Sequence, residues 1–157
     1  MGQYHILVNV DKKEYVIPHD IGSGLKQWEQ IHTEPSIQHA MYALMCCSNY
    51  RGGGDLGEDN DVVYTEIMGR WVGDRVLIVG DYGEDGDVPS IPNAGSLYGT
   101  AQDDPSWTNI SPLVREFFTL EFGVQYIDVE KGGWLDWKIA KRSSDRPALS
   151  PDMTITG

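Results

Sequence analysis

The feature that most constrains this fold is a strand–turn–strand pattern at the start of the chain. Residues 4–17 hold two runs of β-branched and aromatic side chains on either side of a charged turn at 11–13, and Pro18 ends the second run. This pattern predicts a β-hairpin. Residues 124–140 show the same alternation around Gly132-Gly133, which predicts a second hairpin. Both ends of the folded region are therefore expected to form antiparallel sheet.

Helical spacing separates the two predicted hairpins. Residues 36–45 carry apolar side chains three or four positions apart, and residues 111–122 do so again, with Pro112 in the first turn and either Asn109 or Ser111 as the cap. Both stretches predict amphipathic helices. On the first of them, the face expected to be buried consists of Ile37, Ala40, Met41 and Leu44.

The remaining segments complete the predicted order of elements. Residues 25–31 fit a short helix, residues 61–69 fit either a helix or a strand, and residues 75–80 read as a buried central strand. Residues 81–104, rich in Gly, Pro and Asp, predict a long acidic loop with little regular structure. The order predicts a single α+β domain over residues 1–142, with an antiparallel or mixed sheet and two to three helices. Residues 143–157 are expected to form a loosely ordered tail.

The net charge of −12 is concentrated in the middle of the chain. From Asp55 to Asp104 there are twelve acidic residues against Arg70 and Arg75, a balance of −10, which leaves −2 for the rest. A surface of this kind repels nucleic-acid backbones and argues against direct nucleic-acid binding. No apolar run approaches the ~20 residues of a membrane span, and the N-terminus has no leader pattern. We therefore expect a soluble cytoplasmic protein without a membrane partner.

Cysteine and histidine give little support for a metal site. Cys46 and Cys47 are the only cysteines, and neighbouring helical residues point in different directions, so we expect buried, reduced thiols. The four histidines lack the paired spacing of a zinc helix. The acidic runs do not match the calcium-loop pattern. No cofactor fingerprint, Walker loop or nucleophile elbow is present, so we predict no cofactor and lean against an enzyme.

The segment from Tyr50 to Asp55 is the best candidate for a ligand site. Its Arg51 and three consecutive glycines, Gly52, Gly53 and Gly54, combine a guanidinium group with accessible main-chain N–H groups. That combination can bind phosphate or carboxylate. The acidic residues that follow disfavour a free anion, so a nucleotide-like ligand with a stacked base fits better. The predicted ligand-binding residues are Tyr50, Arg51, Gly52, Gly53, Gly54, Asp55, Trp71, Arg75, Tyr82 and His19.

Several of these segments together resemble a known family. They are the opening Met-Gly-Gln-Tyr, the hairpin sequence that follows it, Pro18-His19, the Gly52 to Asp55 loop, and residues 73–82. They are similar to a family of small uncharacterised proteins of bacteria, haloarchaea and their viruses. The resemblance covers roughly the first half of the chain and implies no known activity. For a viral member, it suggests sequestering a nucleotide immune signal.

We therefore favour a non-catalytic binding protein for a small nucleotide-like or phosphorylated ligand, and we expect a homo-oligomer. Two alternatives stay open. The acidic segment from Asp55 to Asp104 could act as a DNA-mimic inhibitor of a basic protein partner. A small hydrolase could instead use His19, Asp20 and the glycine loop, although sequence adjacency alone does not make a catalytic pair.

Overall fold

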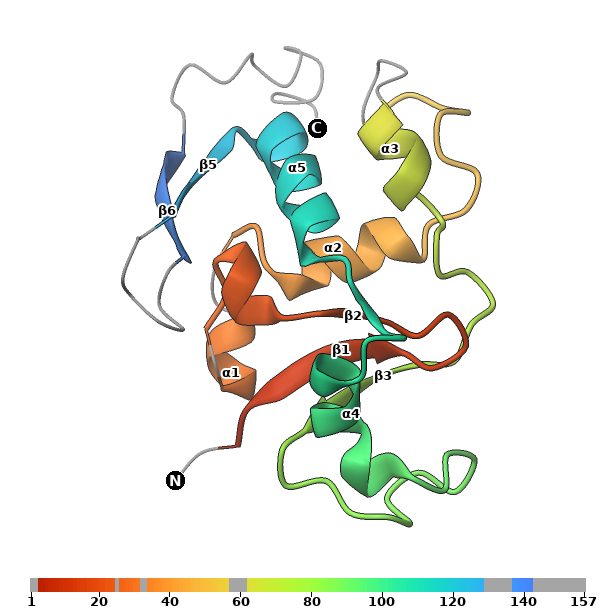
Figure 1. The fold of residues 1–157 in the computed structure, drawn as a ribbon. Helices are drawn as coiled ribbons and strands as arrows, with labels where there is room; N and C mark the ends of the chain where they lie inside the picture. The colour runs from red at the N-terminus through yellow and green to blue at the C-terminus, as the bar shows by residue number, and fades with distance from the viewer. Residues whose placement is uncertain (1–2, 25, 32–33, 57–61, 129–136, 143–157) are drawn as a thin grey trace. The chain divides into compact units, whose positions relative to one another are not determined.

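The predicted N-terminal hairpin is present and forms the centre of a four-stranded sheet. In the computed structural model, which describes residues 3–24, 26–31, 34–56, 62–128 and 137–142, strand β1 (His5–Asn9) pairs antiparallel with β2 (Glu14–Val16). Strand β3 (Val76–Gly80) joins β1 antiparallel, and β4 (Thr108–Asn109) lies parallel to β2. The strand order is β3-β1-β2-β4, so the sheet is mixed (Figure 1).

Strand β3 lies at an edge of the sheet, which corrects the prediction of a central strand. Within the described part of the chain β3 pairs with β1 alone. Ile78 is 43% exposed, whereas Val79 and Gly80 are buried. The apolar composition of a strand indicates that its side chains are covered by packing. It does not indicate whether the strand has one neighbouring strand or two.

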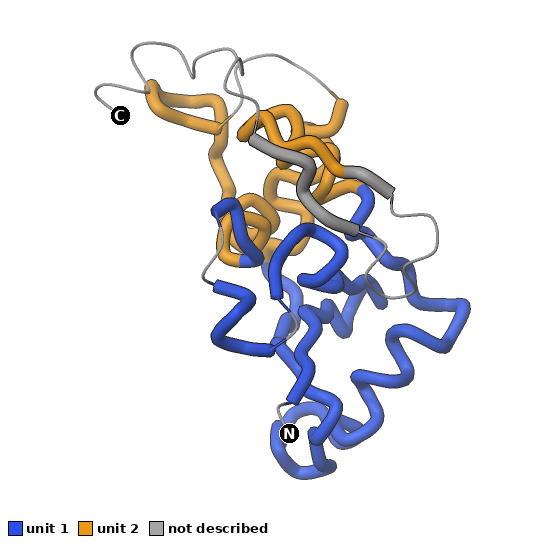
Figure 2. The backbone as a smooth tube through the Cα atoms, turned by 90° about the vertical axis from the view of Figure 1, so that its left-hand side faces the viewer, with its two compact units in different colours: residues 1–37, 73–112 blue, residues 38–72, 113–157 orange. Residues whose placement is uncertain are grey.

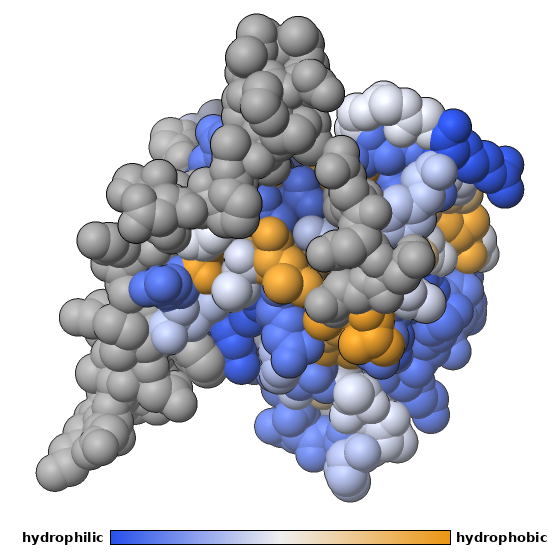
Figure 3. Space-filling view, turned by 90° about the horizontal axis from the view of Figure 1, so that it is seen from above, coloured by the Kyte–Doolittle hydropathy of each residue, from blue (hydrophilic) through white to orange (hydrophobic). Residues whose placement is uncertain are grey.

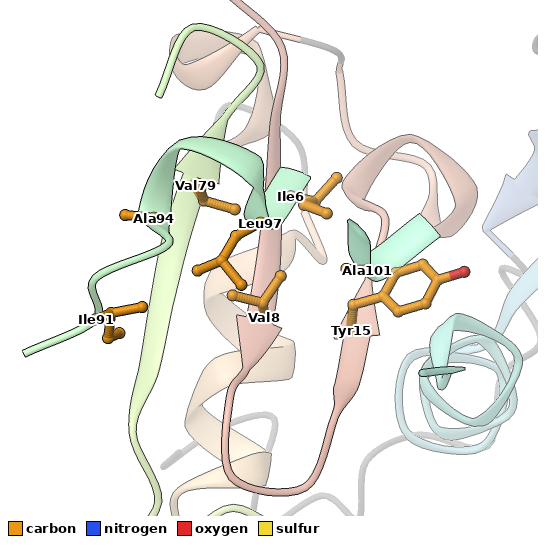
Figure 4. Packing of buried hydrophobic residues seen from close by; sticks show 8 residues of the cluster. All are labelled: Ile6, Val8, Tyr15, Val79, Ile91, Ala94, Leu97 and Ala101. Carbon is orange, nitrogen blue, oxygen red and sulfur yellow. The ribbon is translucent and has the colours of Figure 1, made fainter. Parts of the chain in front are cut away.

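A helix covers one face of this sheet and corrects a second prediction. The segment 81–104 was expected to be irregular, yet it contains a 3₁₀ turn, η2 (Ala94–Ser96), and helix α4 (Leu97–Asp103). Leu97 and Ala101, one helical turn apart, are both 1% exposed. They pack against alternate residues of the strands, because side chains two apart share a face (Figure 4). The cluster consists of Ile6, Val8, Tyr15, Val79, Ile91, Ala94, Leu97 and Ala101.

The chain forms two compact units, coloured separately in Figure 2. The first, residues 1–37 and 73–112, holds the four-stranded sheet with η2 and α4, together with η1 (Pro18–Ile21) and α1 (Gln27–Gln30). The second, residues 38–72 and 113–157, holds most of α2 (Ile37–Leu44) and α5 (Ser111–Phe122), and all of α3 (Val62–Ile67). It also holds the antiparallel pair β5 (Val124–Asp128) and β6 (Trp137–Arg142).

Aromatic packing forms the interior of the second unit. Phe117 and Phe118 are fully buried, and Tyr64 is 4% exposed. Tyr64 meets Phe117 edge-on with ring centroids 5.8 Å apart, and Phe122 meets Phe117 at 6.0 Å. Edge-on pairs at these distances add to the stabilisation from apolar burial. Helices α3 and α5 are therefore held together by a shared aromatic cluster.

The principal sequence predictions of secondary structure are confirmed. Both long helices and both hairpin strand pairs form, and the ambiguous stretch 61–69 yields the helix α3. Of the two predicted caps, Asn109 accepts a hydrogen bond from the Ser111 amide through its side-chain oxygen at 2.9 Å. The turn at Gly132-Gly133 and the predicted tail 143–157 lie outside the described residues.

The fold is a single α+β domain with a mixed four-stranded sheet. Among the described residues, three helices have seven or more residues: α2, α4 and α5. None of the helices in that part of the chain is long and apolar enough to span a bilayer.

Candidate functional site

The glycine loop after α2 is closed by its own polar side chains. The Asn49 side chain donates to the Leu56 carbonyl at 2.7 Å and accepts from the Leu56 amide at 3.1 Å. Inside this clamp, the Asp55 carboxylate accepts hydrogen bonds from the amides of Arg51 at 2.8 Å and Gly52 at 3.1 Å. The Gly52 amide, followed by those of Arg51 and Tyr50, lowers the pKa of Asp55, although partial desolvation opposes this shift.

These contacts change the interpretation of the loop. The sequence predicted that the main-chain N–H groups would bind a ligand, but those of Arg51 and Gly52 already bind an internal anion. The loop is thus an anion-binding turn that Asp55 occupies. A Cβ atom added at Gly52 or Gly53 would meet nothing within 4 Å. The outer side of the loop is therefore open, and the exposed Arg51 adjoins it.

Of the two aromatic residues predicted near the loop, one is accessible. Tyr50 is 43% exposed and lies edge-on to Tyr64, with ring centroids 6.5 Å apart. Trp71 is only 1% exposed, and its amide donates to the Leu44 carbonyl at the end of α2 at 2.9 Å. The prediction that Trp71 stacks on a ligand is therefore wrong, because its ring is a core side chain in this conformation.

The remaining predicted residues belong to the other compact unit. Arg75 is paired with Asp11, whose carboxylate accepts from Nε at 3.0 Å, from Nη2 at 2.8 Å and from the Arg75 amide at 2.6 Å. The Arg75 side chain first, and then its amide, lower the pKa of Asp11. Tyr82 is 58% exposed, and His19 lies half-buried in η1.

The ten predicted residues are divided between the two units. Arg75 precedes β3 and Tyr82 follows it, so the length of the strand, roughly 3.3 Å per residue, separates them. Seven of the ten predicted residues are in the unit of the glycine loop, and three are in the unit of the sheet. Tyr50, Arg51, Gly52 and Asp55 are the members that the structure brings together.

The segment from Asp81 to Asp104 carries an exposed set of acidic side chains in the sheet-containing unit. It contains six acidic residues, all exposed: Asp81, Glu84, Asp85, Asp87, Asp103 and Asp104. No Lys, Arg or His occurs from Val76 to Val114. Figure 1 shows the segment leaving the end of β3 and returning through α4 alongside the sheet. The six carboxylates therefore lie on one continuous segment of the chain.

Individual carboxylates in this segment also hold local turns. Asp85 accepts from the Gly95 amide at 2.8 Å, and Asp87 accepts from the Glu84 amide at 2.8 Å. Asp104 accepts from both the amide and the hydroxyl of Ser106 at 2.9 Å, and these two bonds lower its pKa, the amide bond most. The carboxylates of the segment are thus fixed to the fold at several points.

A hollow on the outward side of α2 was not predicted from the sequence. It has a volume of about 600 Å³ and is lined by Gln38, Met41, Tyr42, Met45, Cys46 and Cys47. Met41 had been assigned to the buried face, but it is partly exposed here. The cysteines are free, as expected, but Cys46 is only partly buried and Cys47 is exposed, which corrects the prediction that both are buried. The four-residue spacing of Met41 and Met45 was the feature of the sequence that could have indicated this hollow.

Apolar side chains reach the surface in both units. Trp28 is 70% exposed, Tyr42 is 69% exposed and Val62 is 64% exposed. In the view of Figure 3, the visible apolar residues form separate small patches between hydrophilic ones. Single exposed apolar residues of this kind are ordinary on the surface of a folded protein.

No protein-family model matches this sequence, and no curated protein or solved structure shows significant similarity to it. The family resemblance described from the opening motifs therefore stays a prediction.

Proposed function

We propose that this protein is a non-catalytic binding protein whose acidic segment, Asp81 to Asp104, binds the basic surface of a partner protein. The observation that carries the proposal is the exposure of all six acidic side chains in a stretch without a single basic residue. The unit that contains the segment has twelve acidic residues against four basic ones, a balance of −8. Two of those basic residues, Lys12 and Arg75, are already in ion pairs with Asp74 and Asp11.

The demands of folding do not account for this charge. Asp103 and Asp104 lie at the C-terminal end of α4, where the negative end of the helix dipole disfavours carboxylates, and the last turn has no basic residue. Asp85 and Asp87 each stabilise a turn with one oxygen atom, and an asparagine oxygen would accept the same bond. The negative charges exceed what these turns require, and a field of one sign attracts a basic partner.

The test compares two variants with the same change in net charge. The segment variant carries Asn in place of Asp81, Asp85, Asp87 and Asp104, which keeps each hydrogen-bond acceptor and removes four charges. The control variant carries Gln in place of Glu29, Glu34, Glu66 and Glu116, four exposed residues outside the segment. Each protein is used to capture basic proteins from a cell lysate at low and moderate salt, and the captured proteins are identified by mass spectrometry.

We expect the wild type and the control variant to capture the same basic protein, and the segment variant to bind it about tenfold more weakly or worse. Added salt should weaken the wild-type complex, and duplex DNA should compete with it. Equal loss in both four-charge variants would attribute binding to net charge alone. That result, or capture of no basic protein, would refute the proposal.

A second candidate is the nucleotide-like or phosphorylated ligand at Arg51. It is favoured by the exposed Arg51 beside a glycine backbone that is open on its outer side. A phosphate would have to displace Asp55 from the amides of Arg51 and Gly52. Sequestration of a nucleotide immune signal, as the family resemblance suggests for viral members, would depend on this site.

Thermal-shift titration with linear and cyclic nucleotides tests this second candidate. In Asp55→Ala both amides are released and one repelling charge is removed, so nucleotide affinity should rise above that of the wild type. In Arg51→Ala it should fall. If neither the wild type nor Asp55→Ala shifts with any nucleotide, the loop is not a nucleotide site.

A further inference from the structure

Two methionine side chains share the outward face of α2. The Met45 amide donates to the Met41 carbonyl at 3.0 Å, so the helical turn continues one residue past the assigned end of the helix at Leu44. Side chains four apart lie one above the other on a helix. The two thioethers therefore face the same hollow, in which Met45 is 42% exposed. The buried face of the helix is formed by other residues: Ile37, Ala40, Ala43 and Leu44.

Two thiols enter the same hollow from the end of the helix. Cys46 and Cys47 follow the last helical turn, so the rule that neighbouring helical side chains diverge does not apply to them. Both cysteines are free, and both line the hollow with Met41 and Met45. Four of the six lining residues thus carry sulfur.

The backbone that carries these four sulfur-containing side chains is held in place by hydrogen bonds from outside the helix. The Gly69 amide donates to the Ala43 carbonyl, and the Trp71 amide donates to the Leu44 carbonyl, both at 2.9 Å. The buried Trp71 anchors this connection. A fixed backbone limits the ordering that ligand binding requires, which raises affinity.

Thioether and thiolate sulfur atoms are soft ligands, which prefer Cu(I) to oxygen-seeking cations such as Mg²⁺ and Ca²⁺. No cluster of three or more His, Cys, Asp or Glu occurs among the described residues, so a metal ion here would need the methionines. We propose that the hollow binds one Cu(I) ion through Met41, Met45, Cys46 and Cys47.

Binding would require no change in oxidation state. Each cysteine that ligates the metal forms a copper–sulfur bond and releases its thiol proton to solvent, so two protons leave when both cysteines bind. The neighbouring Gln38 and Tyr42 border the hollow without supplying a sulfur ligand.

The experiment titrates the reduced, full-length protein with Cu(I) under anaerobic conditions against a coloured Cu(I) chelator. We expect one Cu(I) per chain. Cys46→Ser/Cys47→Ser should weaken binding by more than about a hundredfold. Met41→Leu/Met45→Leu keeps the apolar volume and removes the thioethers, and it should weaken binding about tenfold. Met68→Leu, a matched change outside the hollow, should have no effect.

Two further measurements separate this site from general thiol chemistry. Ag(I) should compete with Cu(I), because it prefers the same soft ligands, whereas Zn²⁺ should compete poorly. Circular dichroism of each variant establishes that it is folded. Failure of the wild type to retain Cu(I) against the chelator would overturn the proposal, and so would unchanged affinity in Met41→Leu/Met45→Leu.

Discussion

Replacing Tyr64 with phenylalanine should destabilise the protein although it removes only one oxygen atom. The Tyr64 hydroxyl donates to Glu121 Oε1 at 2.9 Å, and the two residues are 4% and 6% exposed. Removing the donor leaves a buried acceptor unsatisfied, which costs about 1–3 kcal/mol of stability. The ring itself is retained, with its edge-on contacts to Tyr50 and Phe117. The loss should therefore measure the hydrogen bond.

Urea unfolding followed by circular dichroism gives the free energy of unfolding for each variant. The Tyr64→Phe variant should lose about 1–3 kcal/mol with an unchanged dependence on urea concentration. Tyr42→Phe removes a hydroxyl from a ring that is 69% exposed, and it should stay within about 0.5 kcal/mol of the wild type.

A double-mutant cycle with Glu121→Leu assigns the loss to the pair. Leucine offers no acceptor for the Tyr64 hydroxyl, so Tyr64→Phe should cost little in this background and the coupling energy should be measurable. A Tyr64→Phe cost below about 0.5 kcal/mol, or a coupling energy near zero, would refute the reasoning. Either result would mean that the buried carboxylate does not depend on this hydroxyl.

Three further predictions concern the backbone. Gly69 has φ +73° and a Cβ there would lie 3.0 Å from the Cys46 carbonyl, so Gly69→Ala should cost about 1–2 kcal/mol in urea unfolding, whereas Gly52→Ala, which meets nothing, should cost little. Ser111→Ala removes the acceptor of the Ile17 amide at 2.9 Å and should cost about 1–3 kcal/mol in the same assay; no loss would contradict it. Because the pKa of Asp55 is lowered on folding, its stabilisation of the loop is complete above its ordinary pKa and is lost as pH falls through the lowered value. NMR titration of the carboxyl group, with amide exchange at Arg51, should show this; an unshifted carboxyl pKa would contradict it.

Local sequence patterns predicted the elements well where a single element carried the signal. The helix at α5 was clear because its apolar spacing, its proline in the first turn and its cap at Asn109 all agreed. Helix α4 was missed because Gly99 and the polar residues around it dilute the spacing of Leu97 and Ala101. That helix is stabilised chiefly by packing on the sheet, which local propensity does not include.

The candidate site was harder to predict because its contacts join distant residues. Arg75 was predicted to bind a ligand, but its partner Asp11 lies 64 residues away in the chain. Burial of Trp71 likewise depends on the end of α2. The Asp55 contact is different, since its donors lie only three and four residues before it, within reach of a local sequence pattern.

The carboxylate of Asp55 also competes with any ligand that would bind the main-chain amides of the glycine loop. A group tethered three or four residues from the amides it binds acts at an effective concentration on the order of millimolar or above. A free phosphate at lower concentration cannot displace it through those amides alone. A ligand that displaces Asp55 would need additional binding free energy from other contacts, with the guanidinium of Arg51 or the ring of Tyr50. The loop is therefore expected to bind only ligands that make several contacts at once. A small anion that contacts the two amides alone should not bind, whatever its shape.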